Sequence, residues 1–420
     1  MTPDRADARA LARTLYDAAV RAADPALAVR RHFAAHPPAA LPAGGRSLVI
    51  AIGKAAPAML AEAMRHVPAP VVALAVTHHG NGRAIPGATV LTAGHPEPDA
   101  AGLDAGRRIV AMLDGAGPQD RVLALISGGG SALAPAPRPP LTLADKQRVN
   151  RLLLASGLEI GQVNLIRQQL SDLKGGGFLR HAAPAPVTAL ILSDVIGNDL
   201  RAIASGPTAA PLGTARDACD LLARRGLLDA LPAAARDLLA ADRESSPVPA
   251  ADNHLVGSNE HALAAMRDAV PPGWTARIVT DRLVGDVSDA AARIARAAAH
   301  ARPDGPQALI FGGETTVVLR GAGRGGRNQE LALRVALLGR DWWRPWVFLS
   351  GGTDGRDGPT DAAGGLVDAG TLGRIRASGA DGARLLADND SHAALSAAGD
   401  LLVTGPTGTN VADVQVLLLR

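Results

Sequence analysis

The sequence is poor in cysteine, in aromatic residues and in runs of one charge. Its single cysteine, Cys219, excludes an internal disulfide and a cysteine-based zinc site. Phe, Trp and Tyr make up only 2% of the 420 residues, too few for a surface on which bases stack. No run of five like charges occurs, and the formal net charge is only +3. We therefore expect no nucleic-acid partner.

Long apolar runs are absent as well. No segment approaches the roughly 20 apolar residues that a membrane span needs. The first residues, Met1–Asp7, carry acids and lack an apolar core, so we expect no signal peptide. Hydrophobic residues make up 47% and charged residues 20%, as in folded globular proteins. These features predict a cytoplasmic protein without a membrane partner, long enough for two or three domains.

The chain alternates apolar strand-like runs with helical segments. Three of the runs, Ser47–Gly53, Arg121–Ser127 and Val187–Ser193, are apolar on both faces, which predicts a parallel sheet covered by helices on both sides. The alternation resumes after a polar, proline-containing stretch at 243–252, which we interpret as a linker. We predict an α/β protein with two domains: a Rossmann-like parallel α/β/α sandwich over 1–242 and a second α/β domain over 253–420.

Three strand-like runs end in glycine pairs or triplets: ALISGGGSAL (124–133), ALIFGGETTV (308–317) and VFLSGGTDGRDG (347–358). In open α/β sheets, ligands collect at the carboxyl ends of strands. The first run ends in Ser127, Gly128, Gly129, Gly130 and Ser131, whose amides could form a nest for an anion at a helix start. The alternative is a plain tight turn.

Charged residues also follow strands. Lys54 stands where a helix begins, and the helix dipole disfavours a cation there, so either it meets an anionic partner or it is a surface lysine. Asp194 follows another strand and is a candidate base or metal ligand. Asp354, Asp357 and Asp361 share a Gly/Pro-rich loop that could hold Mg²⁺, or could be a solvated acidic turn.

Two further patterns allow alternatives. Arg167, Ser171 and Lys174 follow helical spacing and are predicted on one helix face, which could bind an anion or be a solvated basic face. The segment Gly321–Gly326 satisfies G-x-G-x-x-G, but Asp341 precedes the next strand, where a dinucleotide site needs an acid at its end. Taken together, phosphate nests, cations and clustered carboxylates are the parts that phosphoryl transfer uses.

Several strings also resemble a known family. They include AIGKAAPAM, GHPEPD (94–99), LISGGGSAL, NLIRQQLSDLKGG, LSDVIGND, GRGGRNQELAL, GTDGRDGPTDAAGG and TGPTGTNVADV (404–414). In these strings the chain resembles the class II glycerate kinases, which have a MOFRL C-terminal domain and some of which carry the name hydroxypyruvate reductase. The resemblance covers nearly the whole chain.

The resemblance implies ATP-dependent phosphorylation of D-glycerate at the C2 hydroxyl, giving 2-phosphoglycerate and ADP. It implies ATP and Mg²⁺ in a cleft between the domains and a MOFRL region over about 305–415. The family's key lysine, aspartate and arginine fall on Lys54, Asp194 and Arg327. Besides the loop 127–131, we predict that phosphate or substrate contacts Arg167, Lys174, Glu314 and Asn328.

The sequence departs from the family's pattern at two places, and two rival functions stay open. The chain has Gln168-Gln169 where relatives often have Lys-His, and Gly197-Asn198-Asp199-Leu200 where they often have Gly-Asp-Asp-Pro. An NAD(P)H-dependent hydroxypyruvate reductase and a non-catalytic sugar-acid or nucleotide-binding protein are the two rival functions. Glycerate and ATP are the expected partners, and a homodimer is left open.

Overall fold

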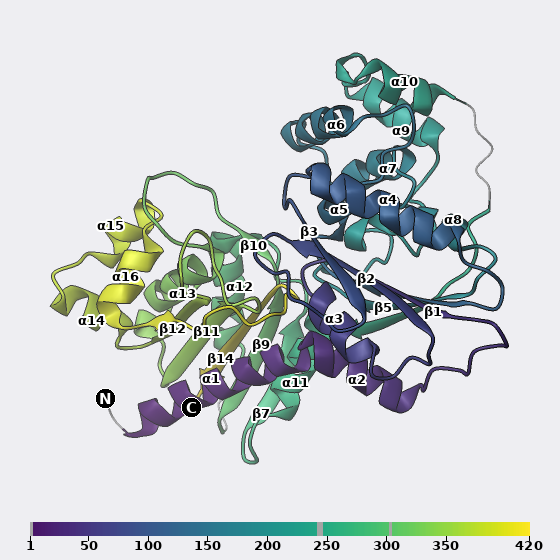
Figure 1. Ribbon diagram of the computed structural model, residues 1–420. Helices are drawn as coiled ribbons and strands as arrows, with labels where there is room; N and C mark the ends of the chain where they lie inside the picture. The colour runs from purple at the N-terminus through teal and green to yellow at the C-terminus, as the bar shows by residue number, and fades with distance from the viewer. Residues whose placement is uncertain (1–2, 242–246, 302–304) are drawn as a thin grey trace. The chain divides into compact units, whose positions relative to one another are not determined.

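The chain folds into two compact units. The computed structural model describes residues 3–241, 247–301 and 305–420 (Figure 1). One unit consists of Pro25–Val256, and the other combines Met1–Asp24 with Gly257–Arg420. Each unit has its own sheet and its own buried core, so each is described separately.

The Pro25–Val256 unit is built on a six-stranded sheet in the order β3-β2-β1-β4-β5-β6 (Figure 1). The pairs from β3 to β5 are all parallel. Every residue of β1 is buried, because its alternate side chains face opposite helical layers. The strands are β1 (Ser47–Ile52), β2 (Val71–His78), β3 (Ala88–Ala93), β4 (Arg121–Ile126), β5 (Val187–Leu192) and β6 (Asp252–Gly257).

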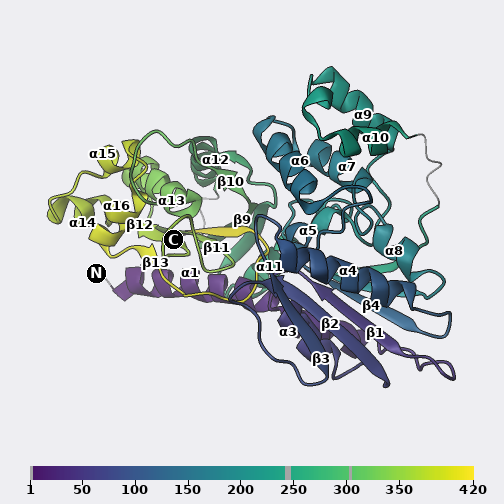
Figure 2. The same cartoon turned by 45° about the horizontal axis from the view of Figure 1, so that its top comes forward.

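Helices cover both faces of this sheet. Figures 1 and 2 show α4 (Ala100–Asp114) on one face and α3 (Ala56–Ala63) on the other. Ile109 of α4 and Phe178 of α8 (Gly177–Ala182) belong to the same buried core as Ile50 of β1. On the opposite face, α3 packs on β1 and β2, and α2 (Pro25–Ala35) packs on α3.

A second, helical core in this unit lies apart from the sheet. Its buried residues include Leu153, Ile166 and Leu222. The helices that supply it are α6 (Leu143–Ala155), α7 (Ile160–Gln169), α9 (Ala215–Arg224) and α10 (Ala233–Ala240). The short elements α5 (Gly130–Leu133), η1 (Ile203–Ser205) and η2 (Leu228–Ala230) complete the unit.

The other unit has a mixed six-stranded sheet in the order β13-β12-β11-β14-β9-β7. Its pairs are antiparallel except for β7 and β9, and β8 and β10 form a separate parallel pair. The strands are β7 (Thr275–Thr280), β8 (Gly285–Asp286), β9 (Gln307–Gly313), β10 (Thr315–Thr316), β11 (Trp346–Gly352), β12 (Gly364–Asp368), β13 (Leu401–Leu402) and β14 (Asp413–Leu419).

Two helical layers enclose this mixed sheet. Phe311, Phe348 and Leu417 share a core with residues of α12, α13 and α16. On the other face, α1 packs on α11, β11 and β14, and the buried Tyr16 hydroxyl donates to the Gly352 carbonyl at 2.7 Å. The helices are α1 (Pro3–Ala22), α11 (Asn259–Asp268), α12 (Val287–Ala299), α13 (Arg327–Leu338), η3 (Gly339–Asp341), α14 (Thr371–Ala377), α15 (Gly382–Ala387) and α16 (Ser391–Ala398).

The predicted α/β class, with a Rossmann-like parallel sheet followed by a second α/β sheet, is confirmed. The units differ from the predicted domains 1–242 and 253–420 at two places. The first 24 residues join the second unit because α1 packs on its sheet, and the segment 252–257 is the last strand of the first sheet. Of the predicted linker 243–252, residues 243–246 lie outside the described part.

One local expectation also differs. The helix predicted to carry Arg167, Ser171 and Lys174 on one face ends at Gln169. Ser171 instead forms an isolated bridge with Pro137, so Lys174 lies in a turn beyond the helix. Within the described ranges, none of the helices combines the length and the apolar character that crossing a membrane requires.

Candidate active site

Three strand ends meet at the carboxyl edge of the first sheet. Because β1, β4 and β5 are parallel neighbours, the residues that follow them lie side by side. Lys54 follows β1, the loop Ser127–Ser131 follows β4, and Asp194 follows β5. The Lys54 amide donates to the Gly128 carbonyl at 2.9 Å, and the Ala55 amide donates to the Ser127 hydroxyl at 3.1 Å. These bonds join the first two strand ends.

Glycine is needed at two positions of the loop. A Cβ atom on Gly128 would overlap the carboxylate of Asp194, so only glycine leaves room for that side chain. Gly129 has a φ of +85°, and a Cβ atom there would lie 3.1 Å from His95 Cδ2 and 3.3 Å from Lys54 Cγ. The loop therefore lies directly against Asp194, His95 and Lys54.

The environment of Asp194 suits a proton acceptor. Burial raises the pKa of its carboxyl above the ordinary value, opposed by a bond from its own backbone and by the nearby charge of Lys54. A carboxylate with a raised pKa accepts a proton more readily than an exposed one. The structure thus brings together two of the three predicted catalytic residues, Lys54 and Asp194.

His95 was not singled out by the sequence analysis, although it lies within the GHPEPD string. Burial lowers the pKa of its imidazole, and the charges of Lys54 and His78 lower it further. A neutral imidazole can donate or accept one hydrogen bond beside the glycine loop without adding a charge. Its position against Gly129 makes it a third side chain of this site.

Ser131, at the end of the loop, lies in a polar network. The buried Lys174 ammonium donates to the Ser131 carbonyl at 2.8 Å and also contacts its hydroxyl. That hydroxyl lies 3.0 Å from the hydroxyl of Ser205, which donates to Asn164 Oδ1 at 3.0 Å. The Arg167 guanidinium, also predicted for this site, donates to Asn150 Oδ1 at 3.0 Å. The helix α5, which begins at Gly130 within the loop, has only four residues, so its dipole adds little.

Arg327, the third predicted catalytic residue, belongs to the other unit. Arg327 is the first residue of α13 and lies against β14. Its Nε donates to Oδ2 of the fully buried Asp413 at 2.6 Å, and its Nη2 donates to Asp413 Oδ1 at 3.0 Å. Its third contact is Glu314, at 3.1 Å. Burial would lower the pKa of Arg327, but the bonds to Asp413 outweigh it, so the pKa is raised and the charge is permanent. Asp413 was missed by the sequence analysis.

Two other predicted residues have structural contacts. Asp357 caps α13, accepting bonds from the Asn328 amide at 3.1 Å and the Gln329 amide at 2.8 Å. Burial raises its pKa, and those amide bonds oppose the shift. Asn328 is fully buried, and its Oδ1 accepts a bond from Ser350 at 2.6 Å. The sequence suggested a substrate contact for Asn328 and a metal for Asp357, and these roles stay predictions.

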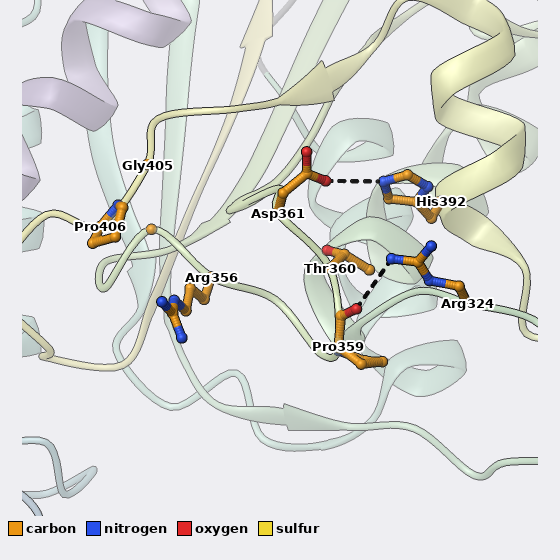
Figure 3. A pocket seen from close by; sticks show the side chains of 9 residues that line it. Arg324, Arg356, Pro359, Thr360, Asp361, His392, Gly405 and Pro406 are labelled. Carbon is orange, nitrogen blue, oxygen red and sulfur yellow. Dashed lines mark hydrogen bonds and ion pairs between the residues drawn. The ribbon is translucent and has the colours of Figure 1, made fainter. Parts of the chain in front are cut away.

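The acidic loop lines a pocket of about 590 Å³ within this unit. Figure 3 shows Arg324, Arg356, Asp361 and His392 around it, with Asp361 paired to His392 at 3.3 Å. Asp354, nearby in the chain, accepts a bond from the Arg356 amide at 3.0 Å. The three predicted metal ligands thus face different partners, and the described residues contain no group of three His, Cys, Asp or Glu placed to hold a metal.

We predict that Asp357→Ala lowers the free energy of unfolding by about 1–2 kcal/mol, because α13 loses its cap and two buried amides lose their acceptor. Thermal unfolding followed by circular dichroism measures this. The matched control is Asp361→Ala, which removes an exposed carboxylate from the same loop and should leave the melting temperature unchanged. Equal melting temperatures for both variants would show that Asp357 does not cap the helix.

The comparisons with known proteins agree with this arrangement. A model of a domain of unknown function, DUF4147, matches residues 11–240, and the MOFRL family model matches 307–413. A D-glycerate 2-kinase of Thermotoga maritima is 38% identical over 89% of this chain and 91% of its own. The chain belongs to the glycerate kinase family with a MOFRL domain. The predicted resemblance is therefore confirmed.

Structural likeness to the glycerate kinases extends over both units. A crystal structure of glycerate kinase from Thermotoga maritima has a TM-score of 0.90 and 35% identity, covering 98% of this chain and 99% of that one. A protein of Agrobacterium vitis that bears a hydroxypyruvate reductase name is 40% identical over 100% of this chain and 96% of its own. Both names thus occur among relatives of this glycerate kinase homologue.

One departure from the glycerate kinase pattern has a structural explanation. The Gln168 amide donates to the Arg201 carbonyl at 2.9 Å and the Ser205 carbonyl at 3.2 Å, and it accepts from the Leu212 amide at 2.8 Å. Ser205 has a φ of +62°, so its backbone needs such support. Gln168 is therefore a buried support for the segment that contacts Ser131.

The glycine pattern 321–326 also has a structural use. Cβ atoms on Gly321 and Gly323 would overlap Asp388 and Asp390, in the segment that leads from α15 to α16. The Gly323 amide donates to the Asp388 carbonyl at 2.9 Å. The glycines thus allow two backbone segments of this glycerate kinase homologue to approach each other, which gives no support to the dinucleotide alternative.

Proposed function

We propose that this protein transfers the γ-phosphoryl group of ATP to the C2 hydroxyl of D-glycerate, giving 2-phosphoglycerate and ADP. The observation that carries the proposal is the contact of Asp194 and Lys54 with the glycine loop after β4, within a chain of the glycerate kinase family. Phosphoryl transfer needs mainly positioning and charge neutralisation, and the lysine, the carboxylate and the glycine loop at this edge of the sheet support the proposal.

Each residue has a distinct part in the proposal. Asp194, with its raised pKa, accepts the proton of the attacking hydroxyl. Lys54 neutralises charge on the transferring phosphoryl group. Arg327 adds a permanent positive charge, which Asp413 and Glu314 hold in a fixed orientation. The loop 127–131 holds an anionic group of a substrate with its amides.

Mg²⁺ is proposed as the metal that accompanies ATP. Proteins commonly bind it through one or two carboxylates plus substrate phosphates, so a three-ligand protein site is not needed. Asp357 is saturated by helix amides, whereas the carboxylates of Asp354 and Asp361 reach solvent and fit such a role better. The metal supplies charge neutralisation on the phosphates.

The proposal predicts that activity disappears in EDTA and returns with Mg²⁺. Asp354→Asn should raise the Mg²⁺ concentration needed for half-maximal rate, because a carboxylate ligand becomes a neutral amide. Asp388→Asn, an exposed change elsewhere in the same unit, is the control for a general loss of acidity. A wild-type Mg²⁺ titration for Asp354→Asn would remove that residue from the metal site.

An assay with purified protein separates the proposed function from the reductase alternative. D-glycerate and ATP should give ADP release, followed through a coupled enzyme system. Hydroxypyruvate with NADH or NADPH should give no loss of absorbance at the nicotinamide band. Nucleotide oxidation without ADP release would reverse the assignment, and ligand binding without either reaction would favour a non-catalytic sensor.

A further inference from the structure

The chain uses lysine only around the glycine loop. Of its 43 Lys and Arg residues, three are lysines: Lys54, Lys146 and Lys174. Lys54 lies against Gly129, Lys174 bonds to Ser131, and Lys146 of α6 is close enough to depress the pKa of Lys174. An ammonium is a compact charge that loses its proton readily when buried, a property that arginine lacks.

Lys146, Arg167 and Lys174 form a cation cluster, which we name the α6–α7 cluster. They come from α6, from α7 and from the turn after α7, within one unit. Burial and, to a smaller extent, the charge of Arg167 lower the pKa of Lys146 to about 8. The pKa of Lys174 is held well below its usual range by burial and by the positive charges of Lys146 and Arg167. No carboxylate of the described residues opposes these shifts.

Elsewhere the protein neutralises converging arginines. Arg9 and Arg374 share Asp368 and Asp400, and the half-buried Arg327 has Asp413 and Glu314. Near the α6–α7 cluster, the acids already have other partners. Asp145 accepts bonds from Thr142 at the start of α6, and Asp172 pairs with Arg138 at 3.4 Å. Uncompensated cations of this kind are stabilised when an anion binds.

Lys146 and Arg167 are partly exposed, whereas Lys174 is buried behind Ser131. Ser131 ends the same loop that begins at Ser127 and lies three residues from Gly128, which contacts Asp194. The Cα atoms of Gly128 and Ser131 are at most about 11 Å apart, since each residue spans up to about 3.8 Å. A group held at Ser131 is therefore bound by the same loop that contacts Asp194.

We propose that Lys146, Arg167 and Ser131 bind the carboxylate of the acceptor glycerate, and that Lys174 positions Ser131. This inference rests on the proposed function. In glycerate the carboxylate is bonded to C2, whose hydroxyl faces Asp194 in the proposed mechanism. Lys54, beside Gly129, is left for the phosphoryl group.

The test compares Lys146→Met with Arg148→Met, which removes an exposed charge from the same helix. ADP release is measured while D-glycerate and ATP are varied separately. Lys146→Met should raise KM for D-glycerate about tenfold or more, as expected for losing a charged hydrogen bond. Its kcat and its KM for ATP should change less than twofold, and Arg148→Met should match wild type.

Each other outcome overturns the inference in a recognisable way. A rise in KM for ATP alone would place a nucleotide phosphate at the α6–α7 cluster. Wild-type KM values for Lys146→Met would show that the cluster binds neither substrate. If Lys146→Met unfolds, Lys146→Gln and calorimetric titration of D-glycerate decide the question. The wild-type protein is assayed first. Absence of ADP release in that assay would refute the proposed function itself, separately from the inference about the α6–α7 cluster.

Discussion

Replacing Asp194 by Asn is expected to lower kcat with D-glycerate by about 100-fold to 10,000-fold, the usual contribution of a positioned general base. The amide keeps the shape that fits against Gly128 but cannot accept the hydroxyl proton. Because burial disfavours the charged carboxylate, the variant should melt at the same or a higher temperature than wild type. ADP release and thermal unfolding measure the two effects.

The matched control for this variant is Asp199→Asn. Asp199 lies on the same segment after β5 but is paired with Arg201 at the surface. Its replacement should change kcat less than twofold. If Asp194→Asn keeps near-wild-type turnover, Asp194 is not the base, and its raised pKa is only a consequence of burial.

Lys54→Ala is expected to lower kcat by at least about 100-fold, because one preorganised charge contact to the transition state is lost. Arg83→Ala, which removes an exposed charge from the same unit, should leave the rate unchanged. Circular dichroism should show that both variants stay folded. A Lys54→Ala enzyme with nearly normal turnover would show that Lys54 is merely a half-exposed surface lysine.

The same variant should also change the pH profile. In wild type, the rate should fall as the pH drops through the pKa of Asp194, since protonation removes the base. Lys54 lowers that pKa, so without Lys54 the pKa rises and the acid limb should move to higher pH. Measuring kcat/KM for D-glycerate between pH 4 and 9 tests this. An acid limb that stays in place would mean that Lys54 does not influence the base.

The sequence was sufficient to predict which residues lie together at the edge of the parallel sheet, because their grouping follows from the order of the strands. Parallel strands bring their carboxyl ends to one edge, so the grouping of Lys54, Ser127–Ser131 and Asp194 could be predicted from three apolar runs and the residues after them. The contact of Gly128 with the Asp194 carboxylate, by contrast, is visible only in the folded chain. In this part of the molecule, the apolar pattern of the sequence and the order of the strands indicate the same grouping of residues.

Residues that depend on tertiary packing were not predicted. Asp413 begins the last strand and meets Arg327 across 86 positions of the chain, and no spacing rule links the two. Lys146 joins the α6–α7 cluster only because α6 packs beside α7. The assignment of α1 to the second unit likewise depends on contacts with α11 and β14, more than 200 residues away. The end of α7 before Ser171 is set by the bridge to Pro137.

The most direct test of the account is the identity of the product. The wild-type protein is incubated with D-glycerate, ATP and Mg²⁺, and phosphorus NMR with proton coupling is used to locate the new phosphate ester. Transfer to C2 predicts one signal, split by the single proton on C2, that coincides with added 2-phosphoglycerate and grows together with ADP. A signal split by two protons and coinciding with 3-phosphoglycerate would contradict transfer to C2, and the absence of any phosphate ester would contradict kinase activity itself.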